Sequence, residues 1–301
     1  MQIIEFLNLH LVYQSIIMHT MSMQKTISSK PTAFDTKSLS SKSLEKILPE
    51  GLVVDRAWLN AQGISRPNID YYLRTNRLEA VARGAYRRPG PTLKWEHLVY
   101  SLQALGYSVH VGGRAALELQ GYAHYLSMSG KQLIDLYGVR HIPASLLTSS
   151  PSIKLVVHSA DLFIELPAEA ITTKPFGHWD WLIKYATPEL ALLELLSAVK
   201  SEADFSVMDK FFESAVTLRP LLLNNLLCAC KQVKAKRLFL WFANRHHHAW
   251  LKQIDISKIN LGSGKRVIAV GGALDKQYQI TVPREMQNKG NQANGTESNL
   301  F

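Results

Sequence analysis

Side chains suited to hydrogen bonding with bases and phosphates are concentrated between Asp55 and Lys94. This stretch holds eight basic residues against three acidic ones. Arginine can bond guanine bidentately, asparagine can bond adenine in the same way, and tyrosine can reach a phosphate. The sequence therefore predicts a DNA-binding set made of Arg66, Asn68, Tyr71, Arg74, Thr75, Arg77, Arg83, Arg87 and Arg88.

Short helices joined by a tight turn must position the first of these side chains. The sequence predicts one helix over Ser43–Leu48 and a second that begins after Asp55, as its N-cap, and ends at Gly63. We expect the second helix to bury Ala57, Trp58 and Leu59. A third helix opens at Ser65, with Pro67 in its first turn, where a missing N–H is tolerated. The short link between the last two helices is typical of a helix-turn-helix.

The third helix has one apolar face. Ile69, Tyr72 and Leu73 follow the spacing i, i+3, i+4, which predicts that they point inward. The opposite face then carries Asn68, Tyr71 and Thr75, flanked by Arg66 and Arg74. This helix is the expected recognition helix.

A basic hairpin follows the recognition helix. Leu78, Val81 and Tyr86 lie around the pair Arg83–Gly84, which predicts two short strands and a tight turn. Helix-turn-helix patterns also arise by chance, and basic surface helices are commonly just solvated. The added hairpin favours the DNA-binding interpretation, because a basic hairpin in this position is what forms the wing of a winged helix.

The cysteines and the consecutive histidines lack the spacing of a metal site. Cys228 and Cys230 lie two apart on a predicted helix, so their thiols point to different faces. His246, His247 and His248 diverge by about 100° per residue on a helix. Structural zinc needs four converging ligands. The sequence predicts no metal and no cofactor.

Two glycine-containing segments invite comparison with phosphate-binding loops. Asn260–Arg266 lacks the first glycine of that motif, since residue 259 is isoleucine, and the hydroxyl residue after its lysine. Gly112–Gly113 lies at a predicted strand-to-helix turn that could attract an anion. Its spacing is not that of a dinucleotide motif, so tight packing is the favoured reason for glycine there. With no converging carboxylates and no nucleophile in a recognisable turn, the sequence favours a protein that is not an enzyme.

Beyond the hairpin, the pattern changes to a mixed α/β domain with a C-terminal helical bundle and hairpin. The chain as a whole is therefore expected to be α+β, with the winged helix-turn-helix over residues 43–93 and the second domain over 94–286. The predicted helices are Trp95–Gly106, Arg114–Gln120, Thr187–Leu196, Asp204–Thr217, Leu221–Cys230 and Lys234–His248. The predicted strands are Ser108–Val111, Leu133–Val139, Ile153–Val157, Leu162–Leu166 and Trp179–Tyr185, with a final hairpin of Arg266–Val270 and Tyr278–Val282.

A second concentration of positive charge runs from Lys231 to Arg266, with nine basic residues and one acidic residue, Asp255. It predicts a further surface for an anion or a partner, although a solvated helix face is an equally good explanation. The residues assigned to it are Lys231, Lys234, Lys236, Arg237, Arg245, Lys265 and Arg266.

Composition sets the broad class of the 301-residue chain. It carries a formal net charge of +10, is 47% hydrophobic and has only two cysteines, so an oxidised disulfide scaffold is excluded. The apolar residues 1–20 lack the basic start and cleavage site of a secretory signal and are interrupted too often for a membrane span. We expect residues 1–42 to be a disordered or mis-assigned lead-in, with Met21 or Met23 as alternative starts, and residues 287–301 to be a flexible tail. The expected location is the cytoplasm, with association to the nucleoid when DNA is bound.

Several segments together resemble a known family. LPEGLVVDRAWLNAQGISRPNIDYYLRTNRLEAVARGAYRRPG is similar to the N-terminal winged helix of AbiEi-type antitoxins, and VYSLQALGYSVHVGGRAALELQGYAHYL to the start of the second domain. KRLFLWFANRHHHAW and LGSGKRVIAVGGALDKQYQITVP resemble C-terminal landmarks of the family. The resemblance extends from Leu48 to Pro283.

This resemblance implies two activities and two partners. Such antitoxins belong to type IV toxin–antitoxin, or abortive-infection, systems of bacteria; the winged helix represses the operon at its own promoter, and the second domain counters a toxin with a nucleotidyltransferase fold. One winged helix contacts few base pairs, so two copies on repeated half-sites are expected. The alternatives are a stand-alone regulator without a toxin and, less favoured, an enzyme acting on nucleic acid.

Overall fold

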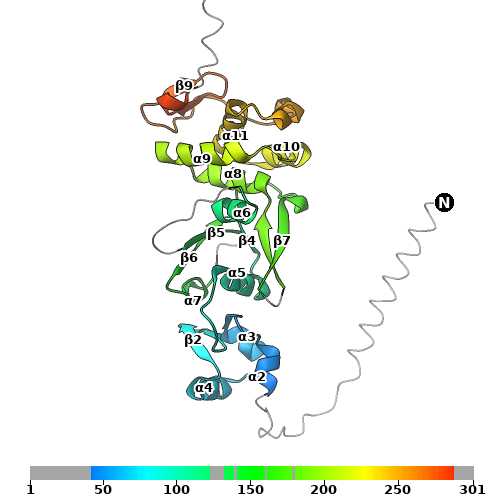
Figure 1. The fold of residues 1–301 in the computed structure, drawn as a ribbon, viewed down its shortest axis with the longest axis vertical. Helices are drawn as coiled ribbons and strands as arrows, with labels where there is room; N and C mark the ends of the chain where they lie inside the picture. Colours follow the sequence, from blue (N-terminus) through cyan, green and yellow to red (C-terminus); the bar gives the residue numbers. More distant parts are fainter. Residues whose placement is uncertain (1–41, 123–131, 139–140, 160, 178–179, 288–301) are drawn as a thin grey trace, which may run out of the picture. The chain divides into compact units, whose positions relative to one another are not determined.

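The computed structural model describes residues 42–122, 132–138, 141–159, 161–177 and 180–287 (Figure 1). The chain divides into two compact units, Met1–Lys46 and Ile47–Phe301. Helix α2 (Lys42–Ile47) includes the last residues of the first unit and Ile47 of the second, and a helix was predicted at this position. The predicted disordered lead-in and flexible tail lie outside the described residues, apart from Lys42 and Gln287.

The second unit begins with a winged helix-turn-helix. Helices α3 (Arg56–Ala61) and α4 (Arg66–Arg74) are followed by strands β2 (Glu79–Ala82) and β3 (Ala85–Arg87). The short strand β1 (Val54–Asp55) completes an antiparallel sheet of order β1-β3-β2. This is the arrangement predicted for the N-terminal domain.

Local signals explain why α3 begins and ends where it does. The Asp55 carboxylate accepts a hydrogen bond from the Trp58 backbone N–H at 2.8 Å, which confirms Asp55 as the N-cap. Gly63 has a φ of +81°, a conformation that favours glycine and lets the chain turn into α4. The expected burial is correct only for Leu59, since Ala57 is exposed and Trp58 half-buried. A six-residue helix can bury only a narrow face, and here that face is supplied by Leu59.

A five-stranded mixed sheet forms the next layer. Its order is β6-β5-β4-β8-β7, with β4 parallel to β8, β5 parallel to β6, and antiparallel pairs β4–β5 and β7–β8. The strands are β4 (Val109–Val111), β5 (Gln132–Gly138), β6 (Ile153–Ser159), β7 (Ile171–Phe176) and β8 (Trp181–Ala186). The helices associated with this layer are α5 (Trp95–Ala104), α6 (Gly113–Leu119), α7 (Ala144–Leu147) and the 3₁₀ turn η1 (Ala168–Ala170).

The strands predicted from the sequence need two corrections: one predicted strand is absent, and one observed strand was not predicted. Leu162–Leu166 is not a strand, because only Phe163 makes an isolated bridge, to Cys230. Strand β7 was missed because Pro175 breaks the usual strand pattern; proline is tolerated there because β7 lies at the edge of the sheet. Val139 and Trp179, at the ends of two other predicted strands, lie outside the described residues.

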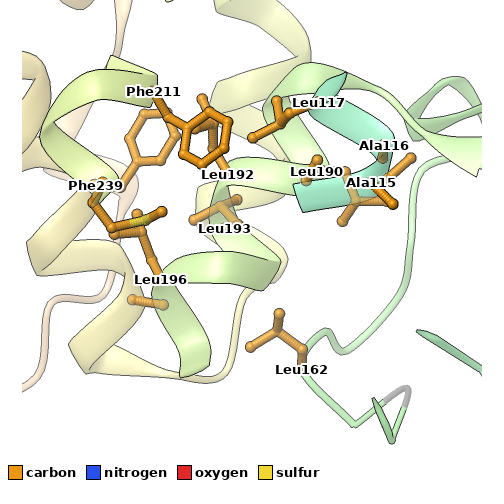
Figure 2. Packing of buried hydrophobic residues seen from close by; sticks show 14 of the residues in the cluster. Ala115, Ala116, Leu117, Leu162, Leu190, Leu192, Leu193, Leu196, Phe211 and Phe239 are labelled. Carbon is orange, nitrogen blue, oxygen red and sulfur yellow. The ribbon is translucent and has the colours of Figure 1, made fainter. Parts of the chain in front are cut away.

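Four helices follow the sheet in the chain. They are α8 (Pro188–Ala198), α9 (Glu202–Ser214), α10 (Pro220–Ala229) and α11 (Val233–Arg245), each within a few residues of its predicted position. Two of them, α9 and α11, hold the largest fully buried side chains. Helix α8 packs against α6 and against α10 and α11, and leucines on several of its sides are buried (Figure 2). Glu189, in its first turn, accepts hydrogen bonds from the backbone N–H and guanidinium of Arg219, which fixes the start of α10 against α8.

Towards the end of the described residues, a small sheet lies next to α11. Strand β10 (Ile280–Val282) pairs antiparallel with β9 (Ala273–Asp275), and Arg266 makes a parallel bridge to Ile280. The predicted hairpin partner, Arg266–Val270, is therefore wrong as the antiparallel strand. Three short 3₁₀ turns, η2 (Ala249–Gln253), η3 (Ile256–Lys258) and η4 (Arg284–Met286), complete the described chain. In the part of the chain that the structure describes, no helix is long and apolar enough to cross a membrane.

Candidate DNA-binding surface

Helix α4 presents one face to the core and the other to solvent. Ile69 and Tyr72 are buried and Leu73 is half-buried, as the spacing predicts. Tyr71 is 52% exposed, and Arg66, Arg74 and Thr75 are also exposed. Asn68 is only half-buried on the flank of this face. The predicted recognition residues of α4 therefore share one accessible side, with Asn68 at its margin.

Three residues of the predicted DNA-binding set, at the end of α4 and just after it, have backbone or ring partners that fix the direction of their side chains. The Thr75 hydroxyl donates to the Tyr71 carbonyl at 2.9 Å, and Arg74 Nε donates to the Asp70 carbonyl at 3.3 Å. The Arg77 guanidinium lies 5.0 Å from the centre of the Tyr72 ring, a cation–π contact. Thr75 thus closes the helix end, while Arg74 is held along the exposed face.

The wing separates its arginines into different environments. Arg83 is exposed at the turn between β2 and β3, and Arg88 is half-buried after β3. Arg87 forms an ion pair with Glu79 and donates to the carbonyls of Pro91 and Gly90. Its side chain is only 12% exposed. The guanidinium of Arg87 therefore ties the wing to the loop that follows it.

Arg56, at the start of α3, is a surface cation that the sequence-based set omitted. Its Nη2 donates to the Tyr86 hydroxyl at 3.4 Å, and this bond is the main reason that its pKa is raised. The contact places Arg56 beside β3. Nothing in its spacing distinguishes it from an ordinary surface arginine, so only the fold could reveal it.

The second group of cations does not form one surface. Lys231, Lys265 and Arg266 are exposed, but Lys236 and Arg237 are each only 3% exposed. For these last two residues the expectation of a surface position is wrong. The physical reason is that α11 lies in the interior of the helical layer, with most of its residues buried.

Arg237 uses its buried guanidinium to hold a distant loop. It donates to the carbonyls of Leu261 at 2.8 Å, Gly262 at 3.1 Å, Gly264 at 2.6 Å and Gln279 at 3.1 Å. The Asn260–Arg266 segment, whose sequence invites comparison with a phosphate-binding loop, is therefore held in place by Arg237 through its backbone carbonyl oxygens.

Lys234 and Arg245 are likewise engaged within the domain. Lys234 Nζ donates to the carbonyls of Ser197 at 2.9 Å and Val199 at 2.7 Å, and burial lowers its pKa. Arg245 pairs with Asp209 at 2.9 Å and donates to the Met286 carbonyl. These two cations therefore hold segments of the chain together, and their hydrogen bonds are made to groups of the protein itself.

The consecutive histidines are structural in the same sense. His246 Nε2 lies 2.7 Å from the Asp209 carboxylate, and His248 Nε2 lies 2.6 Å from the Phe212 carbonyl. The His248 ring stacks between His246 and Trp250, at centroid distances of 5.9 and 5.0 Å. Among the described residues, no group of three or more histidine, cysteine or acidic side chains could hold a metal ion.

Close packing explains the paired glycines, which are the N-cap and the first residue of α6, as the sequence favoured. The buried Glu194 carboxylate accepts a hydrogen bond from the Gly113 N–H at 3.0 Å and lies 2.7 Å from His110 Nε2. A Cβ on Gly112 would come within 2.2 Å of that carboxylate and 2.3 Å of the Tyr137 ring. The N-terminus of α6 therefore already holds a carboxyl group of the protein itself.

A row of three rings crosses the sheet beside this carboxylate. Tyr137 of β5 stacks between His110 of β4 and His158 of β6, at centroid distances of 6.0 and 4.7 Å. His158 Nε2 is 2.7 Å from the Asp135 carboxylate. Burial raises the pKa of both Tyr137 and Glu194. Sequence reasoning missed this row, because its members come from three strands whose pairing the sequence did not reveal.

The fold defines the class: a winged helix-turn-helix protein with a second, mixed α/β and helical domain. The sequence matches two family models, described as "Transcriptional regulator, AbiEi antitoxin N-terminal domain" over residues 37–128 and "Transcriptional regulator, AbiEi antitoxin, Type IV TA system" over residues 134–283. The chain belongs to the AbiEi antitoxin family of transcriptional regulators, from type IV toxin–antitoxin systems.

The fold resembles that of a solved structure. It is the crystal structure of the RV2827C protein from Mycobacterium tuberculosis, with a TM-score of 0.50 and 14% sequence identity, and the match covers 80% of this chain and 89% of that chain. At this identity the likeness concerns the fold alone. A search of curated proteins gave no match.

Proposed function

We propose that this protein is a DNA-binding antitoxin that represses its own operon. The observation that carries the proposal is the exposed side of α4, where Arg66, Tyr71 and Arg74 stand together on an intact helix-turn-helix with a wing beside it. Arginines on such a helix supply base contacts in the major groove, and exposed wing arginines such as Arg83 supply phosphate contacts.

The operator should contain repeated half-sites. A single helix with one wing reads only a few base pairs, too few to distinguish one promoter in a genome. Two copies of the chain on neighbouring half-sites would supply the missing specificity.

The second domain, over residues 94–286, would counter a partner toxin with a nucleotidyltransferase fold. Family membership supports this role. Co-expression of the chain with the product of the neighbouring gene tests it: the toxin alone should arrest growth, and the full chain should restore growth. Continued arrest with soluble, full-length chain present would contradict it.

Binding to the DNA directly upstream of the gene tests the repressor role. The dissociation constant of the full chain would be measured on that DNA and on a random duplex of equal length, across a salt series. We expect preferential binding to the upstream DNA and a steep fall of affinity with salt, because phosphate contacts release counterions. Equal and weak binding to both duplexes would contradict the proposal.

A further inference from the structure

One acidic residue interrupts the cationic side of the recognition helix. Arg66, Asp70 and Arg74 follow one another at i, i+4 and i+8, which aligns them along the exposed face of α4. Asp70 is exposed and is the sole acidic residue of this helix. A carboxylate here faces the same side as the residues proposed to meet DNA.

The Asp70 carboxylate remains available for a ligand. Arg74 donates to the backbone carbonyl of Asp70, not to its carboxylate. Two other acids of the winged helix are occupied, since Asp55 caps α3 and Glu79 pairs with Arg87. In the described ranges no hydrogen bond or ion pair engages the Asp70 carboxylate, although its charge contributes to the raised pKa of Arg56, after the hydrogen bond to Tyr86.

We propose that Asp70 determines operator specificity by accepting a hydrogen bond from the N4 amino group of a cytosine in the major groove. An ionised carboxylate can only accept hydrogen bonds. Cytosine N4 is a donor, and adenine N6 is a donor that lies beside the acceptor N7, whereas guanine N7 and O6, thymine O4 and the phosphates are acceptors that repel the carboxylate. Asp70 therefore weakens binding to most DNA and is satisfied only where a donor stands opposite it.

This inference rests on the proposed repressor function and adds a base preference to it. Its main consequence is a larger ratio between the affinities for the operator and for DNA that lacks the cytosine, not a higher affinity for the operator itself. A wrong base opposite a reading side chain costs roughly 10- to 100-fold in affinity. Removing the carboxylate should lose that factor at one base pair while strengthening binding to random DNA.

The test compares the full chain with its Asp70→Asn variant on three kinds of duplex. These are the upstream operator, operators with each half-site cytosine replaced in turn, and random DNA. The wild-type chain should lose about 10-fold or more at one cytosine position. Asp70→Asn should lose little there, accept adenine at that position, and bind random DNA more tightly, because an amide can both donate and accept.

Glu213→Gln is the matched control, because Glu213 is an exposed acid on α9 with the same change of charge. It should leave the discrimination ratio unchanged. Asp70→Ser serves as a second variant, and thermal unfolding checks that each variant is folded.

Two results would overturn the inference in distinguishable ways. If the wild-type chain prefers its operator and Asp70→Asn keeps the same sensitivity at every cytosine, Asp70 does not read the base and the repressor role stands. If the wild-type chain shows no operator preference, both the repressor role and this inference fail.

Discussion

Two arginines with the same expected role have different surroundings. Arg74 lies exposed on α4, whereas Arg87 is folded back onto Glu79 and the carbonyls of Gly90 and Pro91. Charge and position in the sequence could not separate them. The difference arises from the contacts of Arg87 with Glu79, a cross-strand partner eight residues away, and with the carbonyls of the loop after the wing.

Substitution of Arg74 should therefore affect DNA binding, whereas substitution of Arg87 should affect the stability of the fold. We expect Arg74→Ala to weaken operator binding by about 1–3 kcal/mol with little change in stability. Arg87→Ala should lower the free energy of unfolding by about 1–3 kcal/mol, because Glu79 and two carbonyls lose a charged donor. Urea denaturation and operator titration of both variants measure this. An Arg87→Ala variant of unchanged stability but uniformly weaker DNA binding would place Arg87 at the DNA instead.

Glu194 is the residue on which the packing at the start of α6 depends. Its carboxyl group is buried, joined to His110 and to the Gly113 N–H. Glu194→Ala should lower the free energy of unfolding by about 3 kcal/mol or more, since it leaves buried polar groups without a partner. The control Glu213→Gln should change it by less than about 0.5 kcal/mol. Equal denaturation midpoints for the two variants would show that the carboxyl group is dispensable.

Among the elements, those defined by nearby residues could be predicted and those defined by distant ones could not. The Asp55 cap, the Gly63 turn and the apolar spacing of α4 are local, and they give the helix-turn-helix directly. The cations of α11 were expected at the surface, but the carbonyls that bind Arg237 lie 24 to 42 residues further along the chain. The order of the mixed sheet is equally non-local, which hid the ring row around Tyr137.

The contacts of Arg237 lead to a prediction about the segment of residues 261–279. Arg237→Leu removes the donors for four carbonyls of residues 261–279. We expect this loop to become accessible to proteases and the free energy of unfolding to fall by about 2–4 kcal/mol. Lys231→Ala, at an exposed position outside α11, is the control. Unchanged proteolysis of the Arg237→Leu variant would contradict the assigned role.

At the scale of the whole molecule, the half-buried His97 and the buried His248 link folding to pH. Burial lowers the pKa of His97 and His248 below the usual value of 6.5. The unfolded chain then binds more protons than the folded chain just below that value, so stability falls as the pH drops through this window.

We expect His97 and His248 to lower the denaturation midpoint between pH 7 and pH 5, whereas the raised pKa of Glu194 acts in the opposite direction. His248→Gln should reduce this dependence, because glutamine does not titrate. The midpoints of both proteins at several pH values measure the effect. An identical pH dependence in the variant would show that His248 does not contribute.

The ring row across β4, β5 and β6 also gives the protein an optical property. A phenol held between two imidazoles in a buried site resists ionisation, and Tyr137 is one of 11 tyrosines in the chain. In an alkaline titration followed by ultraviolet absorbance, Tyr137 should ionise only as its sheet opens, because burial raises its pKa. The late part of the absorbance change should therefore report the loss of the second domain without any attached label.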